Sequence, residues 1–467
     1  MREPRARMLS GHSAGAIAAG VSIVVFSATA IALPSAGGAQ AGPPAAPVAA
    51  AASAVDSLVT LALTTSPAIR AANARVDAAQ ARIAPAGARP DPTLMAGIQN
   101  FPISEPGFRD FMTMKMVGVS QTFPYPGKLS RQTTVAEDEL AAATAAADIA
   151  RRTVGREVRS AYYDLAFSSR ALEIVTRTQG IVAGMIPVIE AHYAAGSATQ
   201  ADVLRIRIEA ARLADDGAMV VEEQRAMLAR VNSLLDRSLA TPVGDATIPA
   251  KISRAAVADT ARQISFASSA LGARVAGSPV MALDSIESIA RRNSPALRQR
   301  DAMIAAQTAR AELARRGSRP DIDVSLQYGQ RNSLSDMVTA VVSIPIPLQR
   351  RRKQDAEVAG ADAEVRAMQS DRAAAANQLG SEIARLHGAL ERDRTQLALY
   401  VKAVLPQARA ALASATSGYQ TGRVDFTRLI DAQATLFSYE TQYYRALTDF
   451  AKTLAELEEQ AGIEVLK

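Results

Sequence analysis

The side chains that most often carry out catalysis or bind metals are scarce in this chain of 467 residues. It has no Cys and three His. Disulfides, thiolate metal sites, thiol catalysis and a cysteine-linked lipid anchor are therefore excluded. His12 lies in a predicted targeting segment, so His192 and His387 are the imidazoles left for chemistry. A zinc enzyme or a hydrolase is difficult to build from that set.

The best candidate catalytic residues in this sequence are His192 with Asp202, or the carboxylates of Glu157 and Glu173. No nucleophile motif or phosphate-binding loop accompanies them, and such groups on a helix surface are usually solvated. We therefore predict a protein that is not an enzyme, with no catalytic residues, no cofactor and no resident metal site. The net charge of +6 on so long a chain gives no reason to expect a nucleic acid partner.

Three alternating methionines, Met112, Met114 and Met116, form the remaining chemical pattern. Thioethers are soft ligands, so a ladder of them could bind Cu(I) or Ag(I). The alternation of a β-strand, however, puts all three on one face, which we interpret as the apolar face. We therefore expect these methionines to contact lipid.

The N-terminus has the features of a secretory signal. A basic start is followed by the small-residue apolar stretch 14–33 and by the cleavage motif AQA at 39–41. We expect residues 1–41 to be a signal peptide, with an uncleaved membrane anchor as the alternative, and residues 42–55 to be a flexible Ala/Pro-rich segment. No later segment approaches the roughly 20 unbroken apolar residues of a membrane helix. If the mature chain crosses a membrane, it is expected to do so with strands.

An internal repeat organises the rest of the chain. Landmarks in the first half recur in the same order in the second, at 56–58 and 284–286, 66–70 and 294–298, 89–91 and 319–321, 119–126 and 342–347, and 193–202 and 419–425. We predict a first repeat over 56–283, which ends in a connector at 237–283, and a second over 284–467. Each repeat should contain a helix, a β-hairpin, a very long helix, a Gly turn and a returning helix.

The long helices, expected at 128–194 and 350–418, carry apolar residues every 3.5 positions. This seam runs from Val154 to Tyr193 in the first and from Leu379 to Val404 in the second, and it is typical of coiled coils. The returning helices (200–236 and 425–460) and the preceding ones (66–88 and 294–316) would stack end to end beside them. The fold class is therefore mostly α, with long antiparallel coiled-coil helices.

Four β-segments alternate apolar and polar residues, at about 92–100, 112–123, 321–330 and 337–345. Their length and pattern suit membrane strands, with Val324, Leu326, Val342 and Ile344 facing lipid. We expect each hairpin to lack any other β partner in its own chain. Four strands cannot close a barrel, so the chain must oligomerise. Basic residues at the strand roots suggest contact with lipid headgroups, namely Arg89, Lys128, Arg131, Arg315, Arg316, Arg319, Arg350, Arg351, Arg352 and Lys353.

Over essentially the whole mature chain, this plan resembles the TolC-like outer-membrane efflux family. The resemblance rests on the doubled helix–hairpin–helix plan, the SPA openings at 66–68 and 294–296, and the Tyr-x-x-Gly turns followed by Asp. The stretch QTFPYPGKL at 121–129 resembles the heavy-metal (CzcC- and CusC-like) branch. The family resemblance implies a homotrimer. Its twelve strands would form a transmembrane β-barrel in the outer membrane, above a periplasmic α-barrel tunnel of twelve helices.

The resemblance also implies the partners: a periplasmic adaptor, an inner-membrane pump of the RND type, and outer-membrane lipids. The channel would export metal cations or small toxic compounds passively, without a cofactor. A type I secretion channel would share this plan. From another class, a periplasmic coiled-coil adaptor or structural protein explains the heptads, but it leaves two amphipathic hairpins at equivalent positions unexplained.

In the resembled family, the Gly turns meet the adaptor, and charges just inside them hold the entrance closed. The expected adaptor-docking tip is therefore Gly196, Ser197, Ala198, Gly422, Arg423 and Val424. The expected gate is Asp202, Arg423 and Asp431. Arg428 stands where relatives can carry a second acidic residue, which is a departure from the family pattern. The alternative is that Asp202 and Asp425 cap their helices.

Overall fold

The computed structural model describes residues 54–103, 108, 110–257, 279–332 and 334–466. All of them lie in one compact unit, Ala52–Lys467. The predicted signal peptide at 1–41 is outside the described residues, and so is most of the Ala/Pro-rich segment. The last two residues of that segment, Ala54 and Val55, are not an irregular tail, because they begin the first helix.

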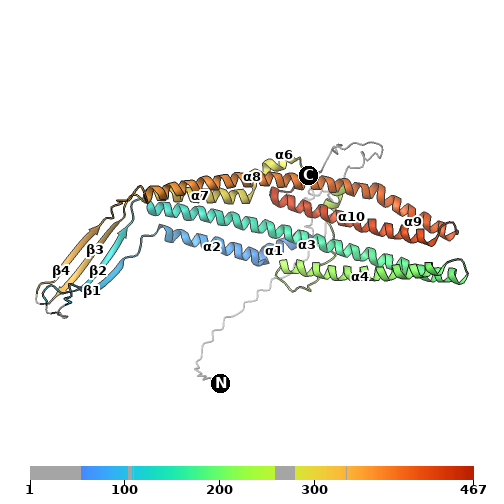
Figure 1. Cartoon of the computed structure of the whole chain (residues 1–467), viewed down its shortest axis with the longest axis horizontal. Helices are drawn as coiled ribbons and strands as arrows, with labels where there is room; N and C mark the ends of the chain where they lie inside the picture. The colour runs from blue at the N-terminus through green and yellow to red at the C-terminus, as the bar shows by residue number, and fades with distance from the viewer. Residues whose placement is uncertain (1–53, 104–107, 109, 258–278, 333, 467) are drawn as a thin grey trace, which may run out of the picture. The chain divides into compact units, whose positions relative to one another are not determined.

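The helices of the two repeats follow the same order, except that the long helix of the first repeat corresponds to three consecutive helical segments in the second. The first repeat contains α1 (Ala54–Thr65), α2 (Pro67–Gly87), α3 (Lys128–Ala194) and α4 (Gln200–Leu234). The second contains α6 (Leu283–Asn293), α7 (Pro295–Arg316), α8 (Gln354–Leu399), a π-helical turn η2 (Tyr400–Val404), α9 (Leu405–Gln420) and α10 (Phe426–Ala461). The helix α5 (Ala250–Val257) lies in the predicted connector. Figure 1 shows the resulting bundle.

Each repeat opens with a short helix that the sequence analysis did not predict, although it placed the start of the next helix correctly. The short helices end before Ser66 and Ser294. A Pro then occupies the first position of α2 and of α7, where a new helix begins. Pro suits that position because its missing N–H would have no partner there. Ser294 also accepts a hydrogen bond from the N–H of Leu297.

The long helix of the first repeat has the predicted bounds. Its 3.5-residue seam from Val154 to Ile189 is buried except at Leu172, Gln179 and Ile186, which are half-buried, and Tyr193 is exposed. The long helix of the second repeat differs from the prediction. It begins at Gln354 and is interrupted by η2, although its seam from Leu379 to Leu397 is buried as expected. The widened turn ends two residues before Pro406. In a regular helix the proline ring would clash with the carbonyl four residues earlier, and that residue lies inside η2.

The helix α3 is the shared neighbour of both repeats. It packs against α1, α2 and α4 from its own repeat and against α7 and α10 from the other, while α8 packs against α7 and α10. In Figure 1, α3 runs from the strands to the turn that joins it to α4, and the turn between α9 and α10 lies at the same end. The predicted columns are therefore present, with α2 and α4 along α3 and α7 and α10 along the second long helix.

One stretch of α3 has a mean hydropathy of 1.3, which by length and composition alone would allow it to span a membrane. The sequence analysis expected no segment of the mature chain to resemble a membrane helix, so this stretch of α3 is more apolar than expected. Five other helices contact α3, and 28% of the residues in this window are buried within the bundle.

The connector joins the two repeats through packing on the second. Its helix α5 contacts α8 and α10, and Lys251 forms an ion pair with Glu464 at 3.0 Å. Val280 makes a β-bridge with Leu466 near the C-terminus. Residues 258–278 of the predicted connector lie outside the described chain.

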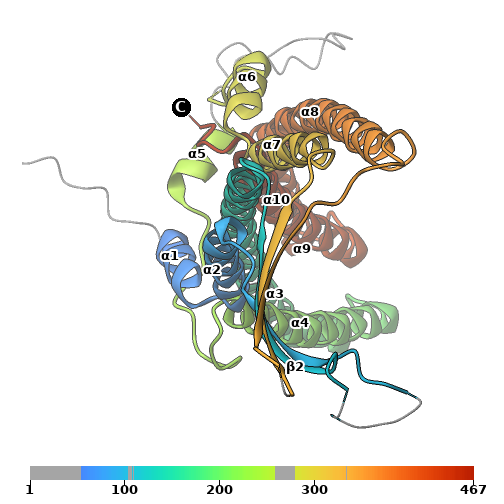
Figure 2. The same ribbon diagram turned by 90° about the vertical axis from the view of Figure 1, so that its left-hand side faces the viewer.

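The four strands form one antiparallel sheet in the order β1 (Thr93–Gln99), β2 (Met114–Phe123), β3 (Ile322–Arg331), β4 (Met337–Ser343). Their bounds agree with the predicted segments to within two residues. The hairpins are not separate, because β2 of the first repeat pairs with β3 of the second over ten residues. The expectation that each hairpin lacks another partner in its chain was therefore wrong. The sheet leaves β1 and β4 as its two edges, seen from the strand end in Figure 2.

Candidate functional site

The turn between α3 and α4 is built around a positive-φ glycine. Gly196 has φ of 74°, which a residue with a side chain rarely adopts. The carbonyl of His192 accepts hydrogen bonds from the N–H groups of Ser197 (2.9 Å) and Ala198 (3.2 Å), which closes the end of α3. Gly196 and Ser197 are exposed and Ala198 is half-buried, so the predicted tip residues are on the surface of the chain.

The turn between α9 and α10 repeats this geometry. Gly422 has φ of 69°, and the carbonyl of Gly418 accepts hydrogen bonds from the N–H groups of Arg423 (2.8 Å) and Val424 (3.2 Å). Asp425 accepts a hydrogen bond from the N–H of Arg428 at 3.0 Å, so it caps α10. The two turns therefore form matching surfaces at the same end of the bundle.

Asp202, the first predicted gate residue, is engaged within its own turn. The carboxylate accepts hydrogen bonds from the Thr199 N–H (2.9 Å) and the Thr199 hydroxyl (2.7 Å), and the Asp202 N–H donates to Thr199 Oγ1. This reciprocal arrangement is a capping box. The alternative that Asp202 and Asp425 cap their helices is therefore what the structure shows.

The other two gate residues, Arg423 and Asp431, are exposed on the second turn and on α10. Neither forms an ion pair within the described part of the chain. Two other contacts link the turns: Arg205 of α4 donates to the Thr427 hydroxyl of α10 at 2.6 Å, and the His192 ring lies 5.8 Å from that of Tyr419. The sequence pattern gave no signal for either of them.

Tyr419 lies at the contact between the two turns, close to Asp202. Burial, and then the negative charge of Asp202, raises the pKa of the Tyr419 phenol above its ordinary value. Its ring also packs edge-on against Phe426, with the centroids 5.8 Å apart. The first turn therefore contacts the second through the His192–Tyr419 ring pair and the Arg205–Thr427 hydrogen bond, and the described residues form no ion pair between the two turns.

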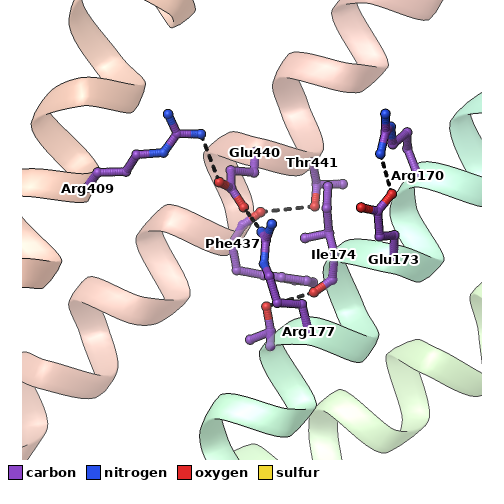
Figure 3. A network of polar contacts seen from close by, with 9 residues as sticks. Arg170, Glu173, Ile174, Arg177, Arg409, Phe437, Glu440 and Thr441 are labelled. Carbon is purple, nitrogen blue, oxygen red and sulfur yellow. Dashed lines mark hydrogen bonds and ion pairs between the residues drawn. The ribbon is translucent and has the colours of Figure 1, made fainter.

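Further along the bundle, a buried carboxylate joins three helices (Figure 3). Glu440 of α10 is 8% exposed, and it forms ion pairs with Arg177 of α3 and with Arg409 of α9, the latter at 3.2 Å. Two guanidinium groups from different helices thus stabilise one charge that burial alone would disfavour. Sequence reasoning missed this contact, because its partners are up to 263 residues apart.

The residues considered for catalysis are dispersed. Glu173 pairs with the neighbouring Arg170 on the surface, as Figure 3 shows, and Glu157 lies 3.5 Å from Arg156. The His192 ring contacts the Ser197 hydroxyl at 3.0 Å, and its expected partner Asp202 is occupied by the capping box. Among the described residues, no group of three or more His, Cys, Asp or Glu could hold a metal ion.

The sheet has one apolar and one largely polar face. Because paired residues share a face, Val324 lies beside Val342, and Leu326 lies beside both Val119 and Ala340. Leu326 is 57% exposed and Val342 63%. The sequence grouped these residues correctly, and Ile344, which follows one residue after β4, is exposed as well.

The methionines of β2 are on the opposite face from the one expected. Met114 pairs with Gln99 and Arg331, and Met116 pairs with Gly97 and Gly329. This is the face on which the Thr122 hydroxyl donates to the Asp323 carboxylate. Met112 precedes the strand altogether. The prediction that all three methionines lie on the apolar face of the strand was therefore wrong.

Most of the basic residues at the strand roots bind groups of their own chain. The ion pairs are Lys128 with Asp321 (2.8 Å), Arg131 with Glu312 (2.8 Å), Arg315 with Asp362 (2.7 Å) and Arg350 with Asp355 (3.5 Å). Arg316 donates to the Pro126 carbonyl, and Arg319 to the Tyr125 hydroxyl. Arg351, Arg352 and Lys353 are exposed, and they pair with no carboxylate in the described part of the chain.

Asp321 fixes the junction between the sheet and the helices. Burial acts to raise the pKa of this carboxyl, but hydrogen bonds from Lys128 Nζ and the Tyr125 N–H, with the charge of Lys128, lower the pKa below its ordinary value. This carboxylate ties the start of β3 to the start of α3, and thereby one repeat to the other.

The repeat plan matches a known family. The model of the outer membrane efflux protein family matches residues 58–235 and 287–462, which is one stretch in each repeat. The chain therefore belongs to the outer membrane efflux protein family, whose members are transport channels and not enzymes. No curated protein matches the sequence.

Solved outer-membrane channels share the fold. The outer-membrane channel OprN matches with a TM-score of 0.70 at 18% identity, over 88% of this chain and 90% of OprN. CusC matches with a TM-score of 0.72 at 16% identity, over 88% of this chain and 92% of CusC. VceC from Vibrio cholerae matches with a TM-score of 0.69 at 18% identity, over 88% of this chain and 96% of VceC.

Replacing Glu440 by Gln should loosen α9 from the bundle. The two arginines are largely exposed and can turn to water, so we expect a loss of about 1–2 kcal/mol, less than for a fully buried pair. The matched control is Glu173→Gln, which removes an exposed ion pair and should cost about 0–1 kcal/mol. Chemical denaturation and hydrogen exchange of α9 would measure both. Equal effects of the two substitutions would contradict the proposed role of Glu440.

Proposed function

We propose that three copies of this chain form a passive channel in the outer membrane, with the helices as a tunnel in the periplasm. The channel works with a periplasmic adaptor and an inner-membrane pump of the RND type, which supplies the energy. The cargo is metal cations or small toxic compounds. One observation carries this proposal: the sheet is amphipathic and has two unpaired edges.

The sheet explains why more than one copy is needed. Edge strands in lipid leave backbone N–H and C=O groups without partners, which costs several kcal/mol for each group. Pairing β4 of one copy with β1 of the next satisfies both edges, and three copies of four strands give a closed barrel of twelve. The apolar face, with Val324, Leu326, Val342 and Ile344, then contacts lipid, and the polar face lines the lumen.

The strand roots fit the same orientation. Arg351, Arg352 and Lys353 follow Ile344 by a few residues, so their charges lie where the lipid-facing surface ends. Basic side chains in such a position are attracted to anionic headgroups. In a soluble periplasmic adaptor, an apolar sheet face of this kind would be exposed to water, which is unfavourable.

The oligomer can be tested directly. The purified full-length protein should need detergent to stay in solution, and its protein mass in the particle should equal three chains. Planar bilayers that contain it should show channels that conduct K⁺. A detergent-independent monomer with full β content would exclude the trimeric channel and favour the coiled-coil adaptor.

The lipid-facing assignment predicts different outcomes for two neighbouring residues. Leu326→Arg should cost roughly 2–4 kcal/mol if the residue lies near the bilayer midplane, because the charge would be placed in hydrocarbon. Ser325→Arg is the matched control, since it points into the proposed lumen and should be tolerated with altered ion selectivity. Folding into lipid vesicles over a range of denaturant concentrations measures both. The assignment fails if the two substitutions are tolerated equally.

The tip is proposed as both docking surface and gate. Gly196, Ser197 and Ala198 and the matching Gly422, Arg423 and Val424 are the residues farthest along the paired helices, where the adaptor would bind. Because Asp202 is held in its own capping box, the gate charges that remain for contacts between copies are Arg423 and Asp431. Partly exposed ion pairs contribute about 0–1 kcal/mol each, but threefold symmetry repeats every one of them three times.

Replacing both Arg423 and Asp431 by Ala should therefore raise the single-channel conductance, while trimer mass and thermal stability stay unchanged. Asp425→Ala is the control: it removes a helix cap at the same turn, so it should cost about 0.5–2 kcal/mol and leave the conductance as it was. Single-channel recordings and thermal unfolding separate the two results. A double variant that stays as closed as the parent channel would rule out this gate.

A further inference from the structure

Four methionines share the polar face of the sheet. They are Met95 on β1, Met114 and Met116 on β2, and Met337 on β4. The strand pairing puts them on the face that also carries Asp323, Ser325 and Gln327. Apart from these methionines and Val341, every residue on this face of the strands is polar or glycine. Large apolar side chains are therefore exceptional there.

Glycines make room for the methionine side chains. Gly329 is the direct cross-strand partner of both Met116 and Met337, and a Cβ on Gly329 would lie 3.2 Å from the sulfur of Met114. Three methionines therefore surround one residue that has no side chain. On the neighbouring pair of strands, Met95 is the direct partner of Gly118.

The same face is hollowed next to these residues. A hollow of about 410 Å³ is lined by Met95, Met116, Gly97, Gly118 and Gln327, among others. The nearest cation in the register is Arg331, whose Nε donates to the Ser335 carbonyl at 2.9 Å, so the guanidinium is bound by the loop that follows β3. Met95 and Met116 are thus next to open space, and the charge next to Met114 is bound by that loop.

Packing in an apolar core does not explain these methionines. A methionine that fills an apolar core contacts other apolar groups, whereas here the direct partners are glycines or polar residues. Thioether sulfur is a soft and polarisable ligand that prefers soft metal ions such as Cu(I) over hard ones. A site that conducts an ion must also bind it weakly enough to release it, which suits thioethers without a thiolate or a carboxylate among them.

We propose that Met95, Met114, Met116 and Met337 form a binding site for soft monovalent cations, Cu(I) and Ag(I), on the wall of the lumen. The site would bind the ion as cargo in transit. This inference rests on the proposed function in one respect, namely that the polar face of the sheet lines the conduit. Threefold symmetry would place three such sites around the pore at the same height.

Silver titration of the full-length protein in detergent tests the proposal. With [methyl-13C]methionine labelling and a chloride-free buffer, the methyl signals of the four methionines should shift on addition of Ag(I). Met219 and Met303, which are exposed on helices, serve as internal controls, and their signals should stay in place. Single Met→Leu substitutions assign the signals. The proposal is overturned if the four signals are unmoved, or if all methionines shift together at the same silver concentration.

A quadruple Met→Leu variant provides a second measurement, since leucine keeps the size and apolar character but removes the sulfur. It should bind silver at least about tenfold more weakly, whereas the control Met219→Leu with Met303→Leu should bind as the parent does. Both variants should still conduct K⁺ in planar bilayers. A parent protein that conducts K⁺ normally but does not bind silver would refute this site alone, and a parent protein that conducts no ion would refute the proposed channel.

Discussion

Close packing along α3 is the constraint on which the rest of the fold depends. Five helices from both repeats contact this one helix, and they can do so because its buried positions include small residues such as Ala145, Ala147 and Ala161. Small side chains let neighbouring helix axes approach, and the burial of apolar area drives the association at roughly 25 cal/mol per Å². The sheet depends on this packing too, because α3 starts where β2 ends, and the Lys128–Asp321 pair ties it to β3.

The features predicted from the sequence are those encoded locally. Helix and strand periods are visible within a few residues, so the bounds of α3 and the lengths of the four strands followed from them. The face of Met114 and Met116 did not follow, because β2 carries apolar residues on both faces. Val117 and Val119 alternate with the methionines, and only the pairing of Val119 with Leu94 and Leu326 decides which face is outward. Pairing is a long-range property, and so is the β2–β3 contact that joins the hairpins.

The distinction between local and long-range features also applies to the contacts near the helix turns. The spacing of Thr199 and Asp202 is that of a capping box, so the local sequence accounts for this carboxylate without any gate. Glu440 has no such local pattern, because Arg177 and Arg409 come from two other helices. The heavy-metal resemblance was carried by the hairpin exit at 121–129. The methionines on the polar face are an independent observation, and they depend on strand register and not on that motif.

The π-helical turn η2 has a geometrical consequence for the second repeat. A π turn contains one more residue than the α-helical turn it replaces, and each residue advances a helix by about 100° around its axis. The stripe of α9 that faces α10 is therefore rotated by about 100° from the position that an unbroken α8 would give it. In the first repeat α3 is uninterrupted, so both of its ends keep the same phase. The two halves of this duplicated chain thus differ in helical phase, and the change comes just before the segment that Glu440 joins to α3.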